Sequence, residues 1–260
     1  MNLTLFSTAK PFRGQEEIQQ SNAIETWMQI EPRPEIMLYG NEPGVGTIAQ
    51  RLGAIHHDNV VTLDDVPLLD SLFSQAQNHA SNDYLVYVNA DVMVIDGLVE
   101  AVQRMAETFT GGFLGICRRW DIQGDEPLDF SRDWRAAIKE EIADNGELHS
   151  TCSSDLFAFK RPLWDLLPFT VGRPEWDNWI FWKATDSGIP VVDLTPVVIT
   201  AHAKHKHGPN RVLEAQTFWR TDHLAQRNRK LGGHGKQYCY RHIQKAGYLW
   251  QMTKDAIERI

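Results

Sequence analysis

The sequence predicts an α/β protein built on a doubly wound, mostly parallel sheet with helices on both faces. Between residues 3 and 107, short apolar segments alternate with segments of helical periodicity, the order typical of parallel β-α-β units. Tyr84–Val88 is a continuous apolar run rich in β-branched and aromatic residues, as expected of a strand buried on both faces. A hydrophobic content of 42% and a charged content of 23% are ordinary for a globular chain of 260 residues.

The first half of the chain contains strands separated by helices. The expected strands are Leu3–Ser7, Glu35–Tyr39, Asn59–Leu63 and Tyr84–Val88. The expected helices are Glu16–Ile30, Thr47–Leu52 and Pro67–Ala80, of which the last is capped by Asp64 or Asp65.

The second half is less regular. Its expected elements are a helix over Gly97–Glu107, strands over Gly112–Cys117 and Ser154–Lys160, a short helix after Arg161-Pro162, and a helix over Trp176–Thr185. Val191–Thr200 contains Pro196, which favours an edge strand or a bent one. Val212–Leu231 and Lys236–Ile260 have helical patterns. We therefore expect an α/β domain over residues 1–208 and a helical C-terminal extension over residues 209–260 that packs on it.

Composition excludes several classes of protein. A formal net charge of -8 argues against a nucleic-acid partner, because phosphate backbones favour clustered Lys and Arg. The 3 cysteines, Cys117, Cys152 and Cys239, are widely spaced and suggest a reducing compartment. No apolar run reaches the roughly 18 residues of a transmembrane helix, and the amino terminus has no secretory pattern. We expect a cytoplasmic protein, with peripheral docking on a membrane left open; no oligomeric state is indicated.

Asn89 and Asp91 directly follow the buried strand Tyr84–Val88. Ligands of open α/β sheets bind beyond the carboxyl ends of such strands. The i, i+2 spacing points both side chains to one side of an extended segment. A strand-ending turn is the alternative, because Asn and Asp are common turn residues.

A basic cluster follows the late apolar strand, with His202 and His205 close to Lys204 and Lys206. Imidazole and carboxylate together suit a divalent ion such as Mn²⁺ or Mg²⁺, although imidazole also suits zinc. The cluster could instead be a solvated loop or a clamp for phosphate.

Two further carboxylates are candidates for chemistry. Asp177 opens a predicted helix, where its charge is favourable, and it lies between Trp176 and Trp179. Desolvation by such neighbours raises the pKa of a carboxyl, which suits a general base acting on a sugar hydroxyl. Asp155 leads into the strand residues Leu156–Lys160 and either holds acceptor hydroxyls or ends a turn.

The loop Ser7–Phe12 follows the first strand, where a nucleotide would bind in a doubly wound half. It has no G-x-G-x-x-G, and neither G-x-x-x-x-G-K-[ST] nor G-x-S-x-G occurs in the chain. Dinucleotide redox chemistry, P-loop hydrolysis and the commonest hydrolase arrangement are therefore disfavoured.

Segments in a fixed order carry a resemblance to a known family. They are FSTAKPF, YGNE, YLVYVNADVMV, SSDLFAFKR, GRPEWDNWI and TAHAKHKHG. Together they resemble nucleotide-sugar-dependent glycosyltransferases of the GT-A fold, most nearly the family-2-like inverting enzymes, over about residues 1–208. The sequence departs from the usual Asp-x-Asp of that family by having Asn89 at the first position, which implies weaker metal binding or less dependence on metal.

The resemblance implies a role for each candidate. Asp91 would bind the metal with Asn89 beside it, His202 or His205 would complete the metal shell, and Asp177 would deprotonate the acceptor. Asp155, with Trp176 or Trp179, would orient the acceptor. The residues implied in nucleotide binding are Thr8, Lys10, Phe12, Asn41, Glu42 and Asp65, together with Asn89 and Asp91.

The implied function is metal-assisted transfer of a sugar, with inversion, from a nucleotide-diphosphate donor to a hydroxyl of a carbohydrate or glycan. The metal would be Mn²⁺ or Mg²⁺. The alternatives are a sugar-phosphate nucleotidyltransferase, whose usual glycine-rich first loop is missing here, a non-catalytic carbohydrate-binding relative, and a metal-dependent phosphoesterase that uses the His cluster.

Overall fold

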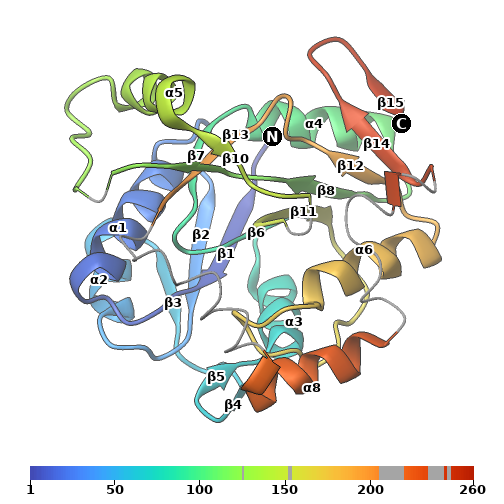
Figure 1. Cartoon of the computed structure of the whole chain (residues 1–260), viewed down its shortest axis with the longest axis horizontal. Helices are drawn as coiled ribbons and strands as arrows, with labels where there is room; N and C mark the ends of the chain where they lie inside the picture. The colour runs from blue at the N-terminus through green and yellow to red at the C-terminus, as the bar shows by residue number, and fades with distance from the viewer. Residues whose placement is uncertain (125, 152–153, 205–219, 234–242, 245–246) are drawn as a thin grey trace.

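A nine-stranded sheet forms the centre of the protein in a computed structural model, which describes residues 1–124, 126–151, 154–204, 220–233, 243–244 and 247–260 (Figure 1). In spatial order its strands are β15 (Ile257–Arg259), β14 (Leu249–Met252), β12 (Val191–Asp193), β8 (Leu114–Cys117), β11 (Leu156–Lys160), β6 (Tyr84–Val88), β1 (Thr4–Thr8), β2 (Glu35–Tyr39) and β3 (Ile55–His57).

The sheet is mostly parallel, as predicted. Strands β3, β2, β1 and β6 run in one direction, and β8, β12 and β14 run in the same direction. Strand β11 is antiparallel between β6 and β8, with Leu156 opposite both Val88 and Cys117. The amino-terminal end of β11 therefore lies at the same edge as the carboxyl ends of β6 and β8.

A smaller, four-stranded sheet extends this edge. Its strands, in order, are β10 (Glu147–Leu148), β9 (Trp120–Ile122), β13 (Ile199–Ala203) and β7 (Met93–Asp96). The register of β13 places His202 opposite Asp121 of β9 and Ala201 opposite Met93 of β7. A separate ribbon pairs β4 (Thr62–Leu63) with β5 (Val66–Pro67).

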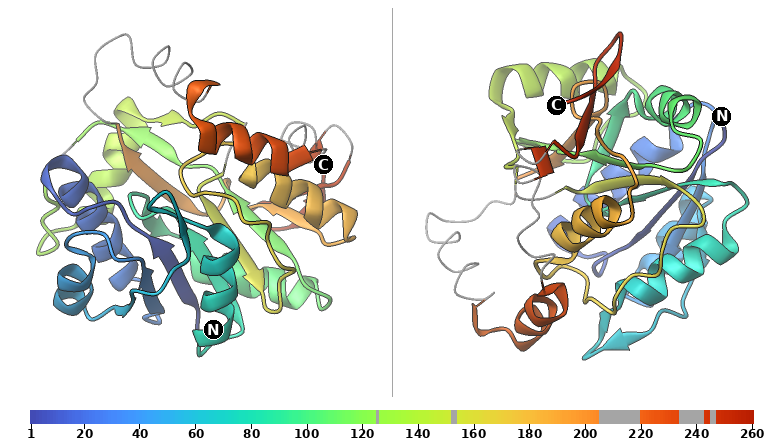
Figure 2. Two further views of the ribbon diagram at one scale, coloured as in Figure 1. Left: turned by 90° about the horizontal axis from the view of Figure 1, so that it is seen from below. Right: turned by 90° about the vertical axis from the view of Figure 1, so that its right-hand side faces the viewer.

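Helices cover both faces of the main sheet (Figures 1 and 2). Helices α1 (Gly14–Met28), α2 (Val45–Leu52), α4 (Leu98–Thr108) and α5 (Trp134–Asn145) contribute to one hydrophobic cluster. Helices α3 (Leu69–His79) and α6 (Trp176–Asp186) contribute to the other, and α8 (His223–Gly232) lies beside α6. No helix in the described ranges could cross a membrane.

Strand β6 shows why the two clusters form. Leu85 and Tyr87 belong to one cluster, whereas Val86 and Val88 belong to the other. Successive side chains of a strand point to opposite faces, so a strand covered on both faces must be apolar throughout. The continuous apolar run in the sequence therefore predicted this strand at its observed bounds.

The expected strand at Asn59–Leu63 is wrong. The third strand of the main sheet along the chain is β3 at Ile55–His57, and within residues 59–63 only Thr62–Leu63 is extended, in the short ribbon. As an edge strand β3 needs little burial, and its Ile55 is 44% exposed, so it has no strong apolar pattern.

The expected cap of α3 is wrong as well. Asp64 and Asp65 adopt positive φ angles of 50 and 61 degrees in the turn between β4 and β5, and the helix starts after Leu68. Asp and Asn tolerate this left-handed conformation better than most residues, which explains their use in so tight a turn.

The second half differs from expectation in three places. No helix forms after Arg161-Pro162 within residues 163–175. Val191–Thr200 bends at the expected place, since Pro196 separates β12 from β13, but β12 lies between β8 and β14 rather than at an edge. The polar stretch between β8 and β11 holds β9, α5 and β10, which the sequence did not predict.

The carboxyl-terminal segment is only partly helical. Helix α8 falls within the expected helical region, but β14 and β15 form a hairpin where a helix over Lys236–Ile260 was expected. Strand β14 pairs with β12, so this hairpin completes the main sheet. The expected domain boundary at residue 208 lies outside the described residues and stays a prediction.

Trp27 gives a test of how α1 supports this edge of the sheet. Its indole is fully buried and donates a hydrogen bond of 2.9 Å to the carbonyl of Val92, just after Asp91. Trp27→Phe leaves that carbonyl without its donor, so we expect the free energy of unfolding to fall by about 1–3 kcal/mol. Urea denaturation measures this, with Tyr248→Phe, at a site 48% exposed, as the control. Equal stability of both variants and wild type would contradict the role of this bond.

Candidate active site

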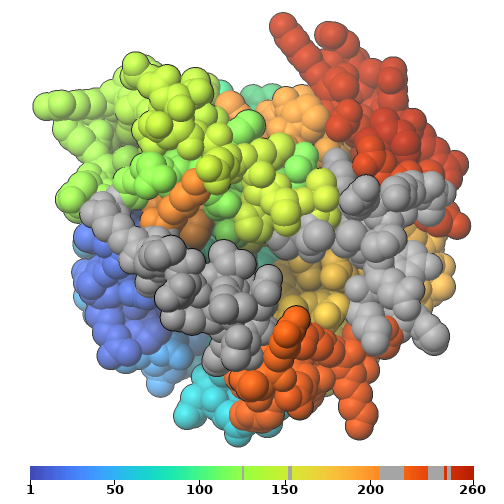
Figure 3. Space-filling model, viewed as in Figure 1, coloured from blue at the N-terminus to red at the C-terminus, as the bar shows by residue number. Residues whose placement is uncertain are grey.

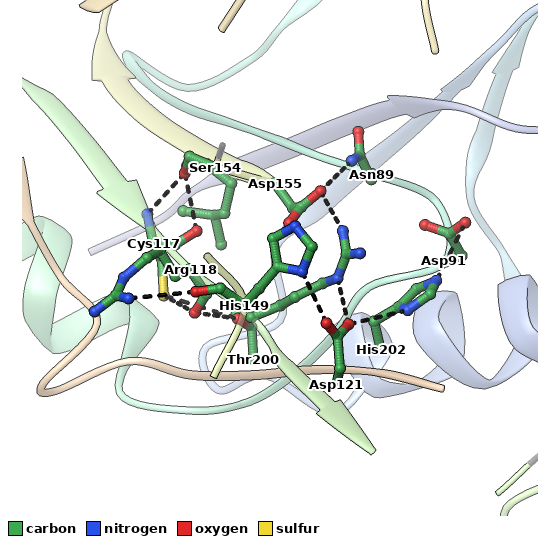
Figure 4. Close-up of polar contacts among 12 residues, drawn as sticks. Asn89, Asp91, Cys117, Arg118, Asp121, His149, Ser154, Asp155, Thr200 and His202 are labelled. Carbon is green, nitrogen blue, oxygen red and sulfur yellow. Dashed lines mark hydrogen bonds and ion pairs between the residues drawn. The ribbon is translucent and has the colours of Figure 1, made fainter. Parts of the chain in front are cut away.

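The site lies where β6 and β8 end and β11 begins (Figure 4). The backbone N–H of Asn89 donates to the carbonyl of Asp155 at 3.0 Å, and its side-chain Nδ2 donates to Asp155 Oδ1 at 2.7 Å. Arg119 Nη1 donates to the same carboxylate oxygen at 2.6 Å. The insertion of an antiparallel strand thus brings together residues that are far apart in the sequence.

Asn89 bridges two residues and is not directed at Asp91. Its Oδ1 accepts a hydrogen bond from the Tyr87 hydroxyl at 3.0 Å, while its Nδ2 contacts Asp155. An aspartate here would place two carboxylates within hydrogen-bonding distance, and like charges so close disfavour ionisation of both. The departure from Asp-x-Asp therefore has a structural reason: the amide supplies a donor that a carboxylate lacks.

Asp91 is the charged end of this motif. Lys10 Nζ donates to its Oδ2 at 3.1 Å, and His202 Nε2 lies 3.7 Å from the same oxygen. Burial raises the pKa of Asp91, but the interactions with His202 and Lys10 outweigh it and hold that pKa well below the usual range. Asp91 is therefore ionised at neutral pH.

Asp121, Arg119 and His149 complete the cluster, and sequence reasoning missed all three. Asp121 lies 3.5 Å from His202 Nδ1, contacts His149 Nδ1 at 2.8 Å and accepts from Arg119 Nε at 2.9 Å. Burial raises the pKa of Asp121, but His149, His202 and Arg119 together lower it below its ordinary value. The sequence positions of Arg119 and Asp121 could have identified them as site residues, because they follow the carboxyl end of the predicted strand Gly112–Cys117, as Asn89 and Asp91 follow Tyr84–Val88.

The arrangement fits a divalent cation in part. Asp91 Oδ2 and His202 Nε2 are close enough to share one ion, and Asp121 beside the other ring nitrogen is the partner that commonly orients a ligating histidine. Within the described ranges no group of three His, Cys, Asp or Glu could hold a metal. A bound ion would thus take further ligands from phosphate oxygens and water, as Mg²⁺ often does. His205 lies outside the described residues.

A cavity of about 370 Å³ opens beside Asp91, and most of the residues expected to bind nucleotide line its wall. Of that expected set, those that line it are Thr8, Lys10, Glu42, Asp65, Asn89 and Asp91. Asn41 is exposed outside it. Phe12 lies in the hydrophobic core under the loop, where Gly44 packs so closely that an added Cβ would come within 2.7 Å of Phe12 Cβ.

Asp177 lies in the first turn of α6 and is 9% exposed. Its Oδ1 accepts the N–H of Asn178 at 2.9 Å. Burial raises its pKa to about 7, and the negative charge of Asp155 adds to that effect. The N-cap residue of the helix is Glu175, so Asp177 is not the cap.

The flanking tryptophans belong to the core. Trp176 and Trp179 are 7% and 6% exposed, and they pack against rings such as Phe157 and Phe169. They therefore supply the apolar surroundings of Asp177 but not a stacking surface for an acceptor sugar. Asp155 is 5% exposed, and its Oδ2 has no hydrogen-bond partner in the part of the chain that the structure describes. That oxygen is suited to accept a hydroxyl donor.

Comparison with known proteins adds similarities of fold. No protein-family model matches the sequence, and no curated protein matches it. Glucosyl-3-phosphoglycerate synthase from Mycobacterium tuberculosis, solved with Mn²⁺, UDP and phosphoglyceric acid, is similar at 18% identity with a TM-score of 0.48, over 82% of this chain and 74% of that one. The mannosyltransferase PcManGT from Pyrobaculum calidifontis, solved with GDP-Man and Mn²⁺, is similar at 13% identity with a TM-score of 0.48, over 94% and 74%.

A synthetase is also similar. CMP:2-keto-3-deoxy-manno-octonic acid synthetase, solved with CTP, has 14% identity and a TM-score of 0.43, over 84% of this chain and 100% of that one. All three TM-scores lie below 0.5, so these similarities carry no argument about activity, and the functional proposal depends on the side chains of the site.

The raised pKa of Asp177 predicts a pH-dependent stability. Between about pH 4 and pH 7 the native state holds a proton on Asp177 that the unfolded chain has lost, so wild-type stability falls as pH rises through this window. At about 1.4 kcal/mol for each pKa unit, the loss is roughly 4 kcal/mol. Asp177→Asn lacks this contribution, so we expect it to be more stable than wild type at pH 8 and similar to it at pH 4. Urea denaturation at both pH values measures this; parallel pH profiles would contradict it.

Proposed function

We propose that this protein is a nucleotide-sugar-dependent glycosyltransferase that transfers a sugar to a hydroxyl group with inversion. One observation carries the proposal: the buried carboxyl of Asp177 has a pKa of about 7 and lies close enough to Asp155 for that charge to raise it. Asn89 links Asp155 to the segment that places the ionised Asp91 on the wall of the cavity. One carboxyl is tuned to accept a proton near neutral pH, and the other stays charged. Carboxyl groups with widely different pKa values are typical of acid–base sites.

The donor would bind in the cavity beside Asp91. Thr8, Glu42 and Asp65 line the part of the wall that comes from the first-strand loop, the turn after β2 and the ribbon, and they would contact the nucleoside. The diphosphate would lie near Lys10, whose ammonium group is 3.1 Å from Asp91. A divalent ion held by Asp91 and His202 would supply positive charge to the leaving diphosphate.

Asp177 would act as the general base. As the acceptor oxygen bonds to the anomeric carbon, the bond from that carbon to the diphosphate oxygen breaks, and the acceptor proton passes to the Asp177 carboxylate. Asp155 would hold a hydroxyl of the acceptor through its Oδ2, while Asn89 and Arg119 fix its other oxygen. A single displacement of this kind inverts the anomeric configuration.

A screen of ligands tests the class of function. Nucleoside diphosphates and nucleotide sugars, with and without Mn²⁺, should raise the melting temperature of the wild-type protein, because a ligand that binds only the native state stabilises it. Nucleotide-sugar consumption with an acceptor then reports transfer. Pyrophosphate release from a nucleoside triphosphate and a sugar phosphate would instead indicate the nucleotidyltransferase alternative.

Asp177→Asn should abolish transfer and leave nucleotide binding unchanged. The amide is close in shape to the carboxylate but cannot accept the proton, and a general base contributes about 10²–10⁴-fold to rate. Asp186→Asn, at the exposed end of the same helix, is the matched control. Initial rates and nucleotide titrations measure both effects. Wild-type rates in Asp177→Asn would exclude Asp177 as the base.

Asp91→Ala should remove the gain in nucleotide affinity that Mn²⁺ gives, at least about tenfold, or ~1.4 kcal/mol. Without metal the affinity should be unchanged or higher, because Lys10 loses its ion-pair partner and becomes available to phosphate. Calorimetric titrations with and without Mn²⁺ measure both quantities, and Asp96→Ala, at the exposed end of β7, is the control. An intact Mn²⁺ effect in Asp91→Ala would remove Asp91 from the metal site.

A further inference from the structure

Arg173 is a second cation on the wall of the donor cavity. Of the residues that line this cavity in the described chain, Lys10 and Arg173 carry positive charge. Lys10 is 55% exposed at its side chain, and its ammonium group is already engaged by Asp91. The side chain of Arg173 is 19% exposed and comes from the turn just before α6. The two cations therefore reach the cavity from different parts of the fold.

Asp222 fixes the orientation of Arg173. Its Oδ1 accepts from Arg173 Nε at 2.9 Å and its Oδ2 from Nη2 at 3.5 Å. Asp222 is also the N-cap of α8, where its Oδ1 accepts the N–H of Ala225 at 2.7 Å. With its side chain only 11% exposed and held by the helix, Asp222 is a rigid partner. A guanidinium group pre-oriented in this way loses little freedom when it binds a ligand.

Helix α8 joins two walls of the same cavity. Through Asp222 it contacts Arg173, and through His223 Nε2 it contacts Asp64 at 2.7 Å, next to the cavity residue Asp65. Asn228, which is fully buried, bonds to the backbone and hydroxyl of Thr170. Figure 3 shows α8 (orange) directly beside the ribbon region (cyan). The helix thus fixes the β4–β5 turn and the segment before α6 relative to each other.

We propose that Arg173, oriented by Asp222, binds the diphosphate of the donor together with Lys10. This inference rests on the proposed function. Because Asp222 takes the Nε and Nη2 side of Arg173, the guanidinium would meet two phosphate oxygens through its Nη1 and Nη2 end, whereas a lysine acts as a point charge. The leaving diphosphate gains negative charge as its bond to the sugar breaks, and a charge fixed at that position stabilises it. Because Asn89 contributes no charge, these side chains account for part of the diphosphate affinity in the absence of metal.

The test compares a nucleoside diphosphate with its own nucleoside. UDP, GDP and ADP are titrated into the protein of 260 residues without metal, and the diphosphate that binds most tightly is then compared with its nucleoside. Arg173→Gln should weaken binding of the diphosphate by about 10- to 100-fold, the range expected for hydrogen bonds to a charged group, and leave the nucleoside unchanged. Arg173→Lys, which keeps the charge but not the fork, should lie between Arg173→Gln and wild type.

Asp222→Asn tests the positioning role. It removes the charge that holds Arg173 but can still cap α8, so the diphosphate affinity should fall less than in Arg173→Gln while the melting temperature stays close to wild type. Arg51→Gln is the control, because Arg51 pairs with Glu25 away from the cavity. It should bind both ligands like wild type.

The possible failures are distinguishable. If wild type binds the diphosphate and Arg173→Gln binds it equally well, the role of Arg173 is overturned and the proposed function stands. An equal loss for diphosphate and nucleoside in both Arg173 variants would also overturn it, since that pattern reports a damaged cavity. If wild type binds no nucleoside diphosphate, with or without Mn²⁺, the proposed function itself fails.

Discussion

The hydrogen bond between the Asn89 amide and the Asp155 carboxylate joins the two halves of the site. It exists because antiparallel β11 is inserted between β6 and β8, which brings the start of one strand to the ends of two others. Asn89 leads through the chain to Asp91 on the donor side, whereas Asp155 and the nearby Asp177 lie on the side proposed for the acceptor. Arg119 contacts the same oxygen of Asp155 and ties it to Asp121, so the carboxylates keep fixed positions relative to one another.

Electrostatics divides the carboxyls into two groups. Asp91 and Asp121 are surrounded by Lys10, Arg119 and imidazoles, which outweigh the cost of burial and keep them charged. Asp177 is buried beside aromatic side chains and close to Asp155, so its pKa is raised and it stays largely protonated up to about pH 7. In the proposed function, the permanently ionised Asp91 would hold the cation that faces the leaving diphosphate, and Asp177 would accept the proton of the hydroxyl.

The sequence predicted the buried strands more accurately than the exposed ones. Strands β2 and β6 were predicted at their observed bounds, because buried strands carry a continuous apolar signal. Edge strand β3 was missed because it is half-exposed and lacks a continuous apolar pattern. Hairpin β14–β15 was missed because its extended conformation depends on the pairing of β14 with β12. Helix propensity is a weak determinant where such a partner exists. Helix α5 was missed although Trp134, Ile138 and Ile142 are spaced as on one helix face after the N-cap Asp133, whereas β9 and β10, with 3 and 2 residues, are too short for a period to show.

By itself the sequence determined the alternation of strands and helices. That alternation predicts a parallel sheet, in which ligand-binding residues follow the carboxyl ends of the strands. This rule selected Asn89, Asp91 and Lys10 as candidate ligand-binding residues. The aromatic neighbours of Asp177 in the sequence predicted that its pKa is raised. Only the tertiary structure decided that Asn89 bonds to Asp155, that Asp121 is the partner of His202, and that Asp222 orients Arg173. Those pairings join residues between 49 and 81 positions apart, and strand register and helix packing set them, which no local pattern of residues encodes.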